Sequence, residues 1–347
     1  QNTLEILSDS NRVSGLTIVR ARRHGVAISG RFNVLGDTLL TGRIVFYDNG
    51  IDVADGAAAA ISGSEASDNL IVDNYIGMIG NGTVRRGNTN GLRIDMRASR
   101  NEIRGNLISG NDGYGVVFSD AVANTLLDNI IGPDITATSG PGNDMGGILL
   151  ENGADSNQIG HTLDDGRNFI CLNGGNGITV RSSDHNLVQG NFIGLDIHGR
   201  TTIGNVGAGV AITEGSAHNI LGGSDSEQRN LSSGNGRDGV LIRGRGTSGN
   251  LLRGNYIGMD RDGIRMKGNG VVDGFGVTID SGASSNLIGT PAVSDINTIS
   301  GNLNGGLRIV GPGANENIVA NNFIGVNAFG SSSSPNAVGV VISGGAR

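Results

Sequence analysis

Apolar residues recur along the chain in short segments in which every second position is apolar. In the most regular of these segments a glycine or alanine precedes an apolar-x-apolar triplet, and eleven copies are visible: Val26/Ile28, Ala59/Ile61, Leu92/Ile94, Val116/Phe118, Ile148/Leu150, Ile178/Val180, Val210/Ile212, Val240/Ile242, Val277/Ile279, Leu307/Ile309 and Val340/Ile342. A period of two is typical of β-strands that bury one face, and it argues against helices. The pattern therefore predicts an all-β protein built from short strands.

Two columns of asparagine accompany these segments, and each asparagine is followed two residues later by an aliphatic residue, with Ser232 as the exception. The first column is Asn69, Asn101, Asn124, Asn157, Asn186, Asn219, Asn250, Asn286 and Asn317, and the second is Asn74, Asn106, Asn129, Asn168, Asn191, Asn230, Asn255, Asn297 and Asn322. Successive members of the first column are 23 to 36 residues apart, a period typical of solenoids. Because equivalent segments repeat in one chain direction, they must lie parallel and adjacent, about 4.8 Å apart.

Three segments per turn predict an all-β, single-stranded parallel β-helix of about 11–12 turns that occupies residues 1–347 as one domain. Between residues 34 and 58 the register blurs, and we expect an irregular insertion there. We expect the asparagines to supply the left-handed backbone of sharp corners and to hydrogen-bond from turn to turn. Neither terminal turn carries a covering cap, so we expect the rod to belong to a longer chain or to associate with itself end to end or side by side.

A two-turn alternation gives the repeat a family resemblance. A turn of the type Asn-x-Ile-x-Gly-Asn-x-Ile-Gly, as at residues 250–258 with Leu252 in the first aliphatic position, alternates with an Asn-x-Ile-Gly, loop, Asn-x-Ile-Ser-Gly-Asn turn, as at residues 286–302. This alternation, over residues 11–347, resembles that of bacterial secreted proteins with a right-handed parallel β-helix. The resemblance implies a right-handed coil. It implies little about chemistry, because similar solenoids serve as polysaccharide lyases, glycoside hydrolases, epimerases, phage tailspikes and adhesin stalks.

The composition narrows the choice of partners. With 62 glycines and 3% aromatic residues, the chain suits a narrow core of stacked aliphatic side chains. Its formal net charge of −7, with scattered basic residues, argues against nucleic acid or an anionic membrane as a partner, and no apolar run is long enough to span a membrane. Cys171 is the single cysteine, so it has no disulfide partner within the chain, and we expect it to be a small apolar filler.

The sequence predicts neither a cofactor nor a metal site. Asp134, Asp196 and Asp260, with Asn327 in the same place, recur in loops of every second turn, about 10 Å apart. That spacing is too long for a shared calcium ion, so we expect these residues to cap turns. The five histidines fall in different columns, and we expect solvated turn residues rather than metal ligands or a proton relay. They are His24, His161, His185, His198 and His218.

Charged residues in the outward position just after the strands of the first pattern form the strongest candidate site. Glu151 and Arg181, on neighbouring turns, are candidate catalytic residues together with Asp95. Asp95 lies two turns from Glu151, near the upper limit of the roughly 6.5–9.5 Å that separates the carboxylates of an inverting glycosidase. Arg243 and Asp280, again on neighbouring turns, are candidate binding residues. Ion pairs between turns would explain the same residues without a ligand.

Two further features are candidate binding surfaces. Asp164 and Asp165 are adjacent carboxylates in a loop and could hold an acid and a base, although simple solvation of the loop is the alternative. The residue between each second-column asparagine and its aliphatic partner forms an apolar column: Tyr75, Leu107, Ile130, Phe169, Phe192, Leu231, Tyr256, Thr298 and Phe323. Alternation points this column outward, as a docking surface for a sugar face with Tyr256 and Phe323 as binding residues, unless a corner turns it inward to close the core.

The even spread of polar residues favours binding over catalysis, because catalysis needs a few unlike groups that converge at one place. The sequence therefore predicts an extracellular or cell-surface rod that presents glycan or protein contacts along its outer columns. A polysaccharide-active enzyme, such as a lyase, glycoside hydrolase or epimerase, is the alternative. The polygalacturonase motifs Asn-Thr-Asp and Arg-Ile-Lys and the epimerase motif Asp-Pro-His-Glu do not occur in the sequence.

Overall fold

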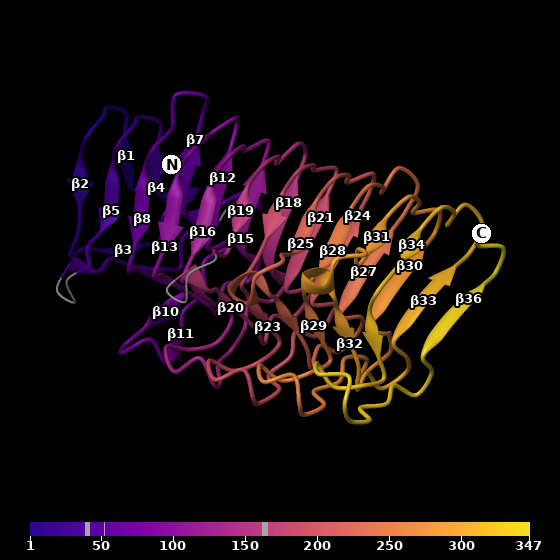
Figure 1. Ribbon diagram of the computed structural model, residues 1–347. Helices are drawn as coiled ribbons and strands as arrows, with labels where there is room; N and C mark the ends of the chain where they lie inside the picture. Colours follow the sequence, from indigo (N-terminus) through magenta and orange to yellow (C-terminus); the bar gives the residue numbers. More distant parts are fainter. Residues whose placement is uncertain (39–41, 52, 162–165) are drawn as a thin grey trace.

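The structure is a computed structural model that describes residues 1–38, 42–51, 53–161 and 166–347. The chain winds through three parallel sheets, named A, B and C here, and visits each sheet once per turn (Figure 1). Sheet A has 12 strands and sheets B and C have 11 each. The prediction of an all-β parallel β-helix is therefore confirmed.

The strands are short throughout. Sheet A consists of β1 (Leu4–Ile6), β4 (His24–Ile28), β7 (Ala57–Ser62), β12 (Leu92–Asp95), β15 (Tyr114–Ser119), β18 (Gly146–Glu151), β21 (Ile178–Arg181), β24 (Val210–Thr213), β27 (Val240–Arg243), β30 (Val277–Asp280), β33 (Leu307–Val310) and β36 (Val340–Ser343). Sheet B consists of β2 (Arg12–Val13), β5 (Val34–Gly36), β8 (Leu70–Val72), β13 (Glu102–Arg104), β16 (Thr125–Leu127), β19 (Gln158–Ile159), β22 (Leu187–Val188), β25 (Ile220–Gly222), β28 (Leu251–Arg253), β31 (Leu287–Ile288) and β34 (Ile318–Val319). Sheet C consists of β3 (Thr17–Val19), β6 (Val45–Tyr47), β9 (Tyr75–Ile76), β14 (Leu107–Ile108), β17 (Ile130–Ile131), β20 (Phe169–Ile170), β23 (Phe192–Ile193), β26 (Leu231–Ser232), β29 (Tyr256–Ile257), β32 (Thr298–Ile299) and β35 (Phe323–Ile324).

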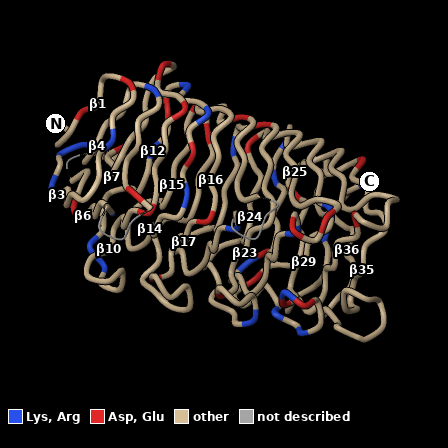
Figure 2. The backbone as a smooth tube through the Cα atoms, turned by 60° about the vertical axis from the view of Figure 1, so that its left-hand side comes forward, with Lys and Arg blue, Asp and Glu red and all other residues tan. Residues whose placement is uncertain are grey.

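A few elements lie outside the three sheets. β10 (Met78–Ile79) and β11 (Val84–Arg85) form an antiparallel hairpin, and two 3-10 helices, η3 (Ser226–Gln228) and η4 (Val293–Asp295), lie in loops between sheets B and C. Across the described ranges of the chain, no helix is long and apolar enough to cross a membrane. Figure 2 shows acidic and basic residues interspersed along the rod.

The apolar columns stack into one continuous core inside the coil. In sheet A, for example, Val116 pairs with Ile148 and Ile148 pairs with Ile178, and all three side chains are buried. The core runs from Ile6 to Ala314. The segment 34–58, where we expected an irregular insertion, supplies β5 and β6, which pair in register with β8 and β9. Cys171 is buried as well.

Asparagine ladders join successive turns, as the two columns predict. In the ladder before sheet B, Oδ1 of Asn124 accepts hydrogen bonds from the backbone N–H and from Nδ2 of Asn101, at 3.0 and 2.9 Å. Nδ2 of Asn101 also donates to the carbonyl of Ala66 at 3.1 Å. The left-handed backbone, however, belongs to the preceding residues, with φ of 53° at Arg100 and 56° at Ala123. Our expectation for the asparagines is wrong on this point, because at these corners the residue before the asparagine has the left-handed backbone while the asparagine points its amide into the ladder.

A third ladder, which the sequence columns did not reveal, lies between sheets C and A. Its members are Asn49, Asn88, Asn111, Asn143, Asn173, Asn205, Asn235, Asn269, Asn302 and Asn336. The spacing between the second-column asparagine and the third-ladder asparagine of the same turn alternates. It is 5 residues in one turn, as from Asn106 to Asn111, and 14 residues in the next, as from Asn129 to Asn143. The longer spacing holds a loop in every second turn, and these loops build one side of the candidate site.

Candidate functional site

The outward column of sheet A forms ion pairs between neighbouring turns. Nε of Arg181 donates to Oε2 of Glu151 at 3.0 Å, and Nη2 of Arg181 contacts the same oxygen. Arg243 forms a two-pronged contact with Asp280, with Nε to Oδ1 at 2.7 Å and Nη2 to Oδ2 at 2.6 Å. In both pairs the carboxylate is much less exposed than the guanidinium. These four charges therefore neutralise one another within the protein.

Asp95 lies on the same face, at the end of β12. Its Oδ2 accepts a hydrogen bond from Nε of Arg93 at 2.6 Å, whereas its Oδ1 is buried without a partner among the described residues. Asp95, Ser119 and Glu151 are successive in register, which separates the two carboxylates by about 9.6 Å. The structure thus brings the candidate catalytic residues onto one face, but each carboxylate already contacts an arginine. Asp164 and Asp165, the other acidic candidates, lie outside the described residues.

Two expectations about the histidines are wrong. The rings of His185 and His218 stack on neighbouring turns with centroids 5.3 Å apart. Both residues directly precede a first-column asparagine, so they do share a column. His24 is not a solvated turn residue but the first residue of β4, and it is 5% exposed. Burial, helped by the positive charge of Arg23, lowers the pKa of His24 to about 4.

The apolar column of sheet C points outward but is covered. Phe192, Leu231 and Tyr256 form a buried cluster with Leu195 and Met259, and this cluster is separate from the core inside the coil. Alternation along the strands therefore gave the right direction for the column. Leu195 and Met259 belong to the loops of every second turn, and these loops fold back over the strands and bury this part of the column. Ile130, Phe169 and Phe323 stay partly exposed.

Those loops form a continuous wall along the carboxyl ends of the strands of sheet C. The loop at 258–268 bonds to its neighbours on both sides, because the N–H of Arg261 donates to the carbonyl of Gly199 and the N–H of Ala328 donates to the carbonyl of Gly263, each at 2.9 Å. Asp196 caps its loop as expected, since its Oδ1 accepts the N–H groups of Arg200 and Thr201 at 2.8 and 3.0 Å. Burial alone would raise the pKa of Asp196, but these hydrogen bonds outweigh it and the pKa is lowered.

A second wall lies along the amino ends of the strands of sheet C. It consists of the loops that connect sheets B and C in alternate turns, at residues 222–229 and 289–296. Asp295 joins these two loops, because its carboxylate accepts the hydroxyl groups of Ser224 at 2.7 Å and Thr290 at 2.6 Å. Between the two walls lie two adjoining hollows of about 250 and 480 Å³, which share Ser226 and Arg229. We call these hollows together the sheet C groove.

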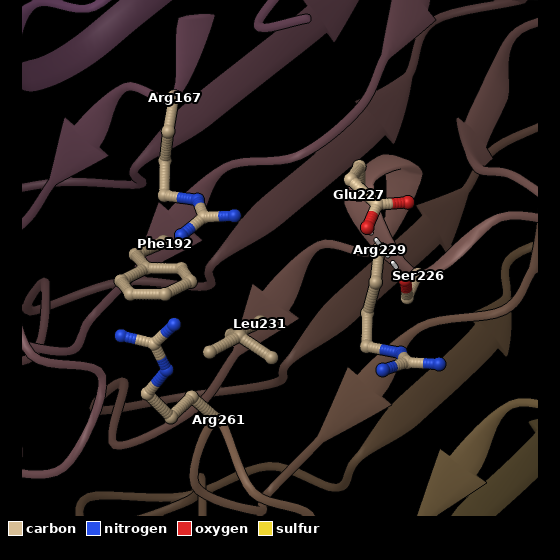
Figure 3. A pocket seen from close by; sticks show the side chains of 7 residues that line it. All are labelled: Arg167, Phe192, Ser226, Glu227, Arg229, Leu231 and Arg261. Atoms are coloured by element: carbon tan, nitrogen blue, oxygen red, sulfur yellow. Dashed lines mark hydrogen bonds between the residues drawn. The ribbon is translucent and has the colours of Figure 1, made fainter. Parts of the chain in front are cut away.

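Arginines stacked on aromatic rings line the first hollow (Figure 3). The guanidinium carbon of Arg167 lies 4.3 Å from the ring centroid of Phe192, and that of Arg261 lies 5.9 Å from it on the other side of the ring. Arg229 stacks in the same way on Tyr256, at 4.0 Å. The backbone holds two of these arginines in place, since Nε of Arg167 donates to the carbonyl of Gly190 at 2.9 Å and Nε of Arg229 donates to that of Gly254 at 3.0 Å.

The groove differs from sheet A in its charge balance. Within the described part of the chain, neither Arg229 nor Arg261 forms an ion pair. Among the described residues that line the groove, Glu227 is the only carboxylate, and it accepts a hydrogen bond from Ser226 at 2.9 Å. That bond lowers the pKa of Glu227. The described residues of the first hollow therefore combine three guanidinium groups with one carboxylate.

Sequence reasoning found part of this site and missed its charges. Tyr256 and Phe323, the aromatic binding candidates, line the groove. Arg243 and Asp280 lie on sheet A, so the structure does not bring them together with the aromatic pair. The arginines of the groove were missed, although a signal existed: Arg167 and Arg229 both stand directly before a second-column asparagine.

The fold has counterparts among known structures. No family model and no curated protein matches the chain. A variant of the periplasmic alginate epimerase AlgG matches with a TM-score of 0.53 and 14% identity, over 98% of this chain and 70% of that chain. The chain is a right-handed parallel β-helix. An alginate lyase from a Paenibacillus species (TM-score 0.47, 14% identity, 96% of this chain and 99% of that chain) and the DFA-IIIase of Arthrobacter chlorophenolicus (0.48, 13%, 95% and 80%) match less closely.

Proposed function

We propose that the protein is an extracellular or cell-surface rod that binds a polysaccharide chain in the sheet C groove. The observation that supports this most is the combination of exposed apolar and guanidinium groups between two walls. In the second hollow Phe329 is 67% exposed and Val293 is 79% exposed, beside Phe323. Aromatic and apolar side chains suit the C–H faces of sugar rings, and guanidinium groups suit their polar substituents. Because the groove follows the column of sheet C, a bound chain would lie along the rod.

The groups in the groove suit binding better than proton transfer. The lowered pKa of Glu227 makes it a poor proton donor at neutral pH. Burial raises the pKa of Tyr256, so its hydroxyl keeps its proton and is a poor base. On sheet A, Glu151 and Asp95 each contact an arginine, so these carboxylates already have partners within the protein. A polysaccharide-active enzyme is the alternative function, and it predicts turnover.

Affinity electrophoresis through gels that contain single polysaccharides, neutral and acidic, tests the proposal. We expect at least one polymer to retard the protein, and the double variant Phe323→Ala, Phe329→Ala to lose about tenfold in affinity. The matched variant Arg243→Ala, Asp280→Ala removes a charge pair on sheet A and is expected to bind normally. Loss of binding in this second variant would move the site to sheet A. Release of unsaturated or shortened products would show that the protein is an enzyme instead.

A further inference from the structure

We infer that the sheet C groove selects an acidic polysaccharide and holds its anionic groups with Arg229 and Arg261. This inference rests on the proposed function and names the class of polymer. Arg229 uses Nε for the carbonyl of Gly254 and one face of its guanidinium for the ring of Tyr256.

The terminal nitrogens of Arg229 are left for a ligand. They form no hydrogen bond or ion pair with the described residues, although Arg229 lines both hollows. A guanidinium fixed in this way presents a planar pair of N–H donors, which matches the two oxygens of a carboxylate or the oxygens of a sulfate. The guanidinium of Arg261 lies 5.9 Å from the ring centroid of Phe192, and its side chain forms no hydrogen bond or ion pair with the described residues. Neutral hydroxyl groups would gain much less from such a donor pair than an anion would.

The two guanidinium groups lie between the two stacked rings. Phe192, Leu231 and Tyr256 are successive in the register of sheet C, so the two rings lie two strands apart, about 9.6 Å. Arg261 lies on the side of Phe192 away from Arg167, and Arg229 stacks on Tyr256 one turn ahead of it. Figure 3 shows Leu231 between these two arginines. Acidic groups of a polymer that crosses this turn would therefore face both arginines.

Two more turns along the rod, the pattern changes. Phe323 follows Tyr256 and Thr298 in the same register, but Ile296 stands where Arg167 and Arg229 stand in the earlier turns, directly before a second-column asparagine. The groove there is lined by Val293, Phe323 and Phe329. The cationic part thus ends after Tyr256, and an apolar part follows it. A bound chain would place its acidic groups over the Phe192–Tyr256 part and an uncharged ring face at the other end.

Binding to one polymer in two chemical forms tests the inference. A polyuronate and the same polyuronate with its carboxyl groups reduced to alcohols are compared by affinity electrophoresis at low and high salt. We expect the acidic form to bind at least about tenfold more tightly than the reduced form, and added salt to weaken only the acidic form. The variant Arg229→Ala, Arg261→Ala is expected to lose this preference and to keep its affinity for the reduced form.

The variant Arg237→Ala, Arg245→Ala is the control. It removes the same net charge from exposed residues that flank β27, and its preference should be unchanged. Thermal unfolding of both variants establishes that they fold. Equal binding of the two polymer forms, or an unchanged preference in the groove variant, would overturn the inference and leave the proposed function standing. If neither form of this or of other polysaccharides binds, the proposed function fails and the inference with it.

Discussion

Arginines on sheet A and arginines beside sheet C meet different residues in the neighbouring turn, and the contrast explains what each face can do. Arg243 contacts Asp280 one turn ahead, so its charge is neutralised inside the protein. Arg229 meets Tyr256 one turn ahead, and an aromatic ring orients a guanidinium without neutralising it. In a β-helix, the residue one turn further along therefore decides whether an outward charge stabilises the fold or is presented to a ligand.

The loops between sheets B and C decide which residue types can stand directly before a second-column asparagine. In turns without a loop between sheets B and C, the residue before the second-column asparagine turns a tight corner, as Gly190 and Gly254 do with φ of 71° and 67°. In the turns with such a loop, Arg167 and Arg229 take this position, and neither arginine has a positive φ. A bulky side chain can then occupy the position at no backbone cost, and it bonds to the carbonyl of the glycine one turn ahead.

The largest expected effect comes from a change in the asparagine ladder between sheets B and C. Asn191 donates from Nδ2 to Asn230, Ile159 and Gln189, and it accepts a hydrogen bond from Asn168. Asn191→Ala leaves several of these buried groups unpaired, so we expect a loss of about 3–5 kcal/mol in the free energy of unfolding. Exposed Asn304 has one such bond, to Gly270, and Asn304→Ala should cost less than about 1 kcal/mol. Urea denaturation measures both, and equal losses would contradict the role of the ladder.

The sequence predicted the coil well, because every turn repeats the same local pattern. A residue such as Ile148 is apolar for the same reason as Ile178 one turn later, so the columns could be aligned without knowledge of the structure. The third asparagine ladder was not predicted, because in every second turn a loop lengthens the distance in sequence between a second-column asparagine and the ladder member that follows it. Asn111 and Asn143 are ladder members without and with such a loop. The His185–His218 stack escaped too, although both residues directly precede a first-column asparagine.

The groove was harder to predict, because its parts come from distant turns. Arg167, Phe192 and Arg261 meet at one ring, yet 94 residues separate the first from the last. Alternation placed Tyr256 and Phe323 on the outside of the sheet. No local pattern showed that the loops would fold back over the column, or that arginines would stack on its rings.

The stability of the protein should depend on pH through sheet A, because that sheet contains a buried titratable group, His24. The pKa of His24 is about 4 in the folded protein and 6.5 in the unfolded chain, so the unfolded chain binds the proton first as pH falls. Stability should therefore be complete above pH 6.5 and decrease as pH falls towards 4, by on the order of 2–3 kcal/mol.

Urea denaturation as a function of pH measures this loss. His24→Gln removes the titration and should flatten the upper part of the curve, just below pH 6.5, while carboxylates with lowered pKa values, such as Asp295, contribute mostly near pH 4 and below. An identical slope in the variant would assign the effect to other groups.

Removal of one arginine from each face has a smaller expected effect on stability. Arg243→Ala leaves Asp280, whose side chain is 11% exposed, without its partner and should cost about 1–2 kcal/mol, a value discounted because the arginine itself is half exposed. Arg229→Ala removes only a stacking contact and one hydrogen bond, so it should cost about 1 kcal/mol or less. Thermal unfolding compares the two. A larger loss for Arg229→Ala would mean that this arginine is mainly structural.

The smallest expected effect comes from backbone strain at a corner of the coil, where no charged side chain is involved. Ala123 is exposed and has a φ of 56°, a conformation that costs an L-residue about 1–2 kcal/mol but is open to glycine. Glycine also gains entropy in the unfolded chain, which offsets about 0.5–1 kcal/mol, so Ala123→Gly should stabilise the protein by roughly 0.5 kcal/mol. Ala217 does not have a positive φ, and the same substitution there should destabilise by a similar amount. Opposite signs in urea denaturation would show that the corner at Ala123, before the ladder residue Asn124, is strained.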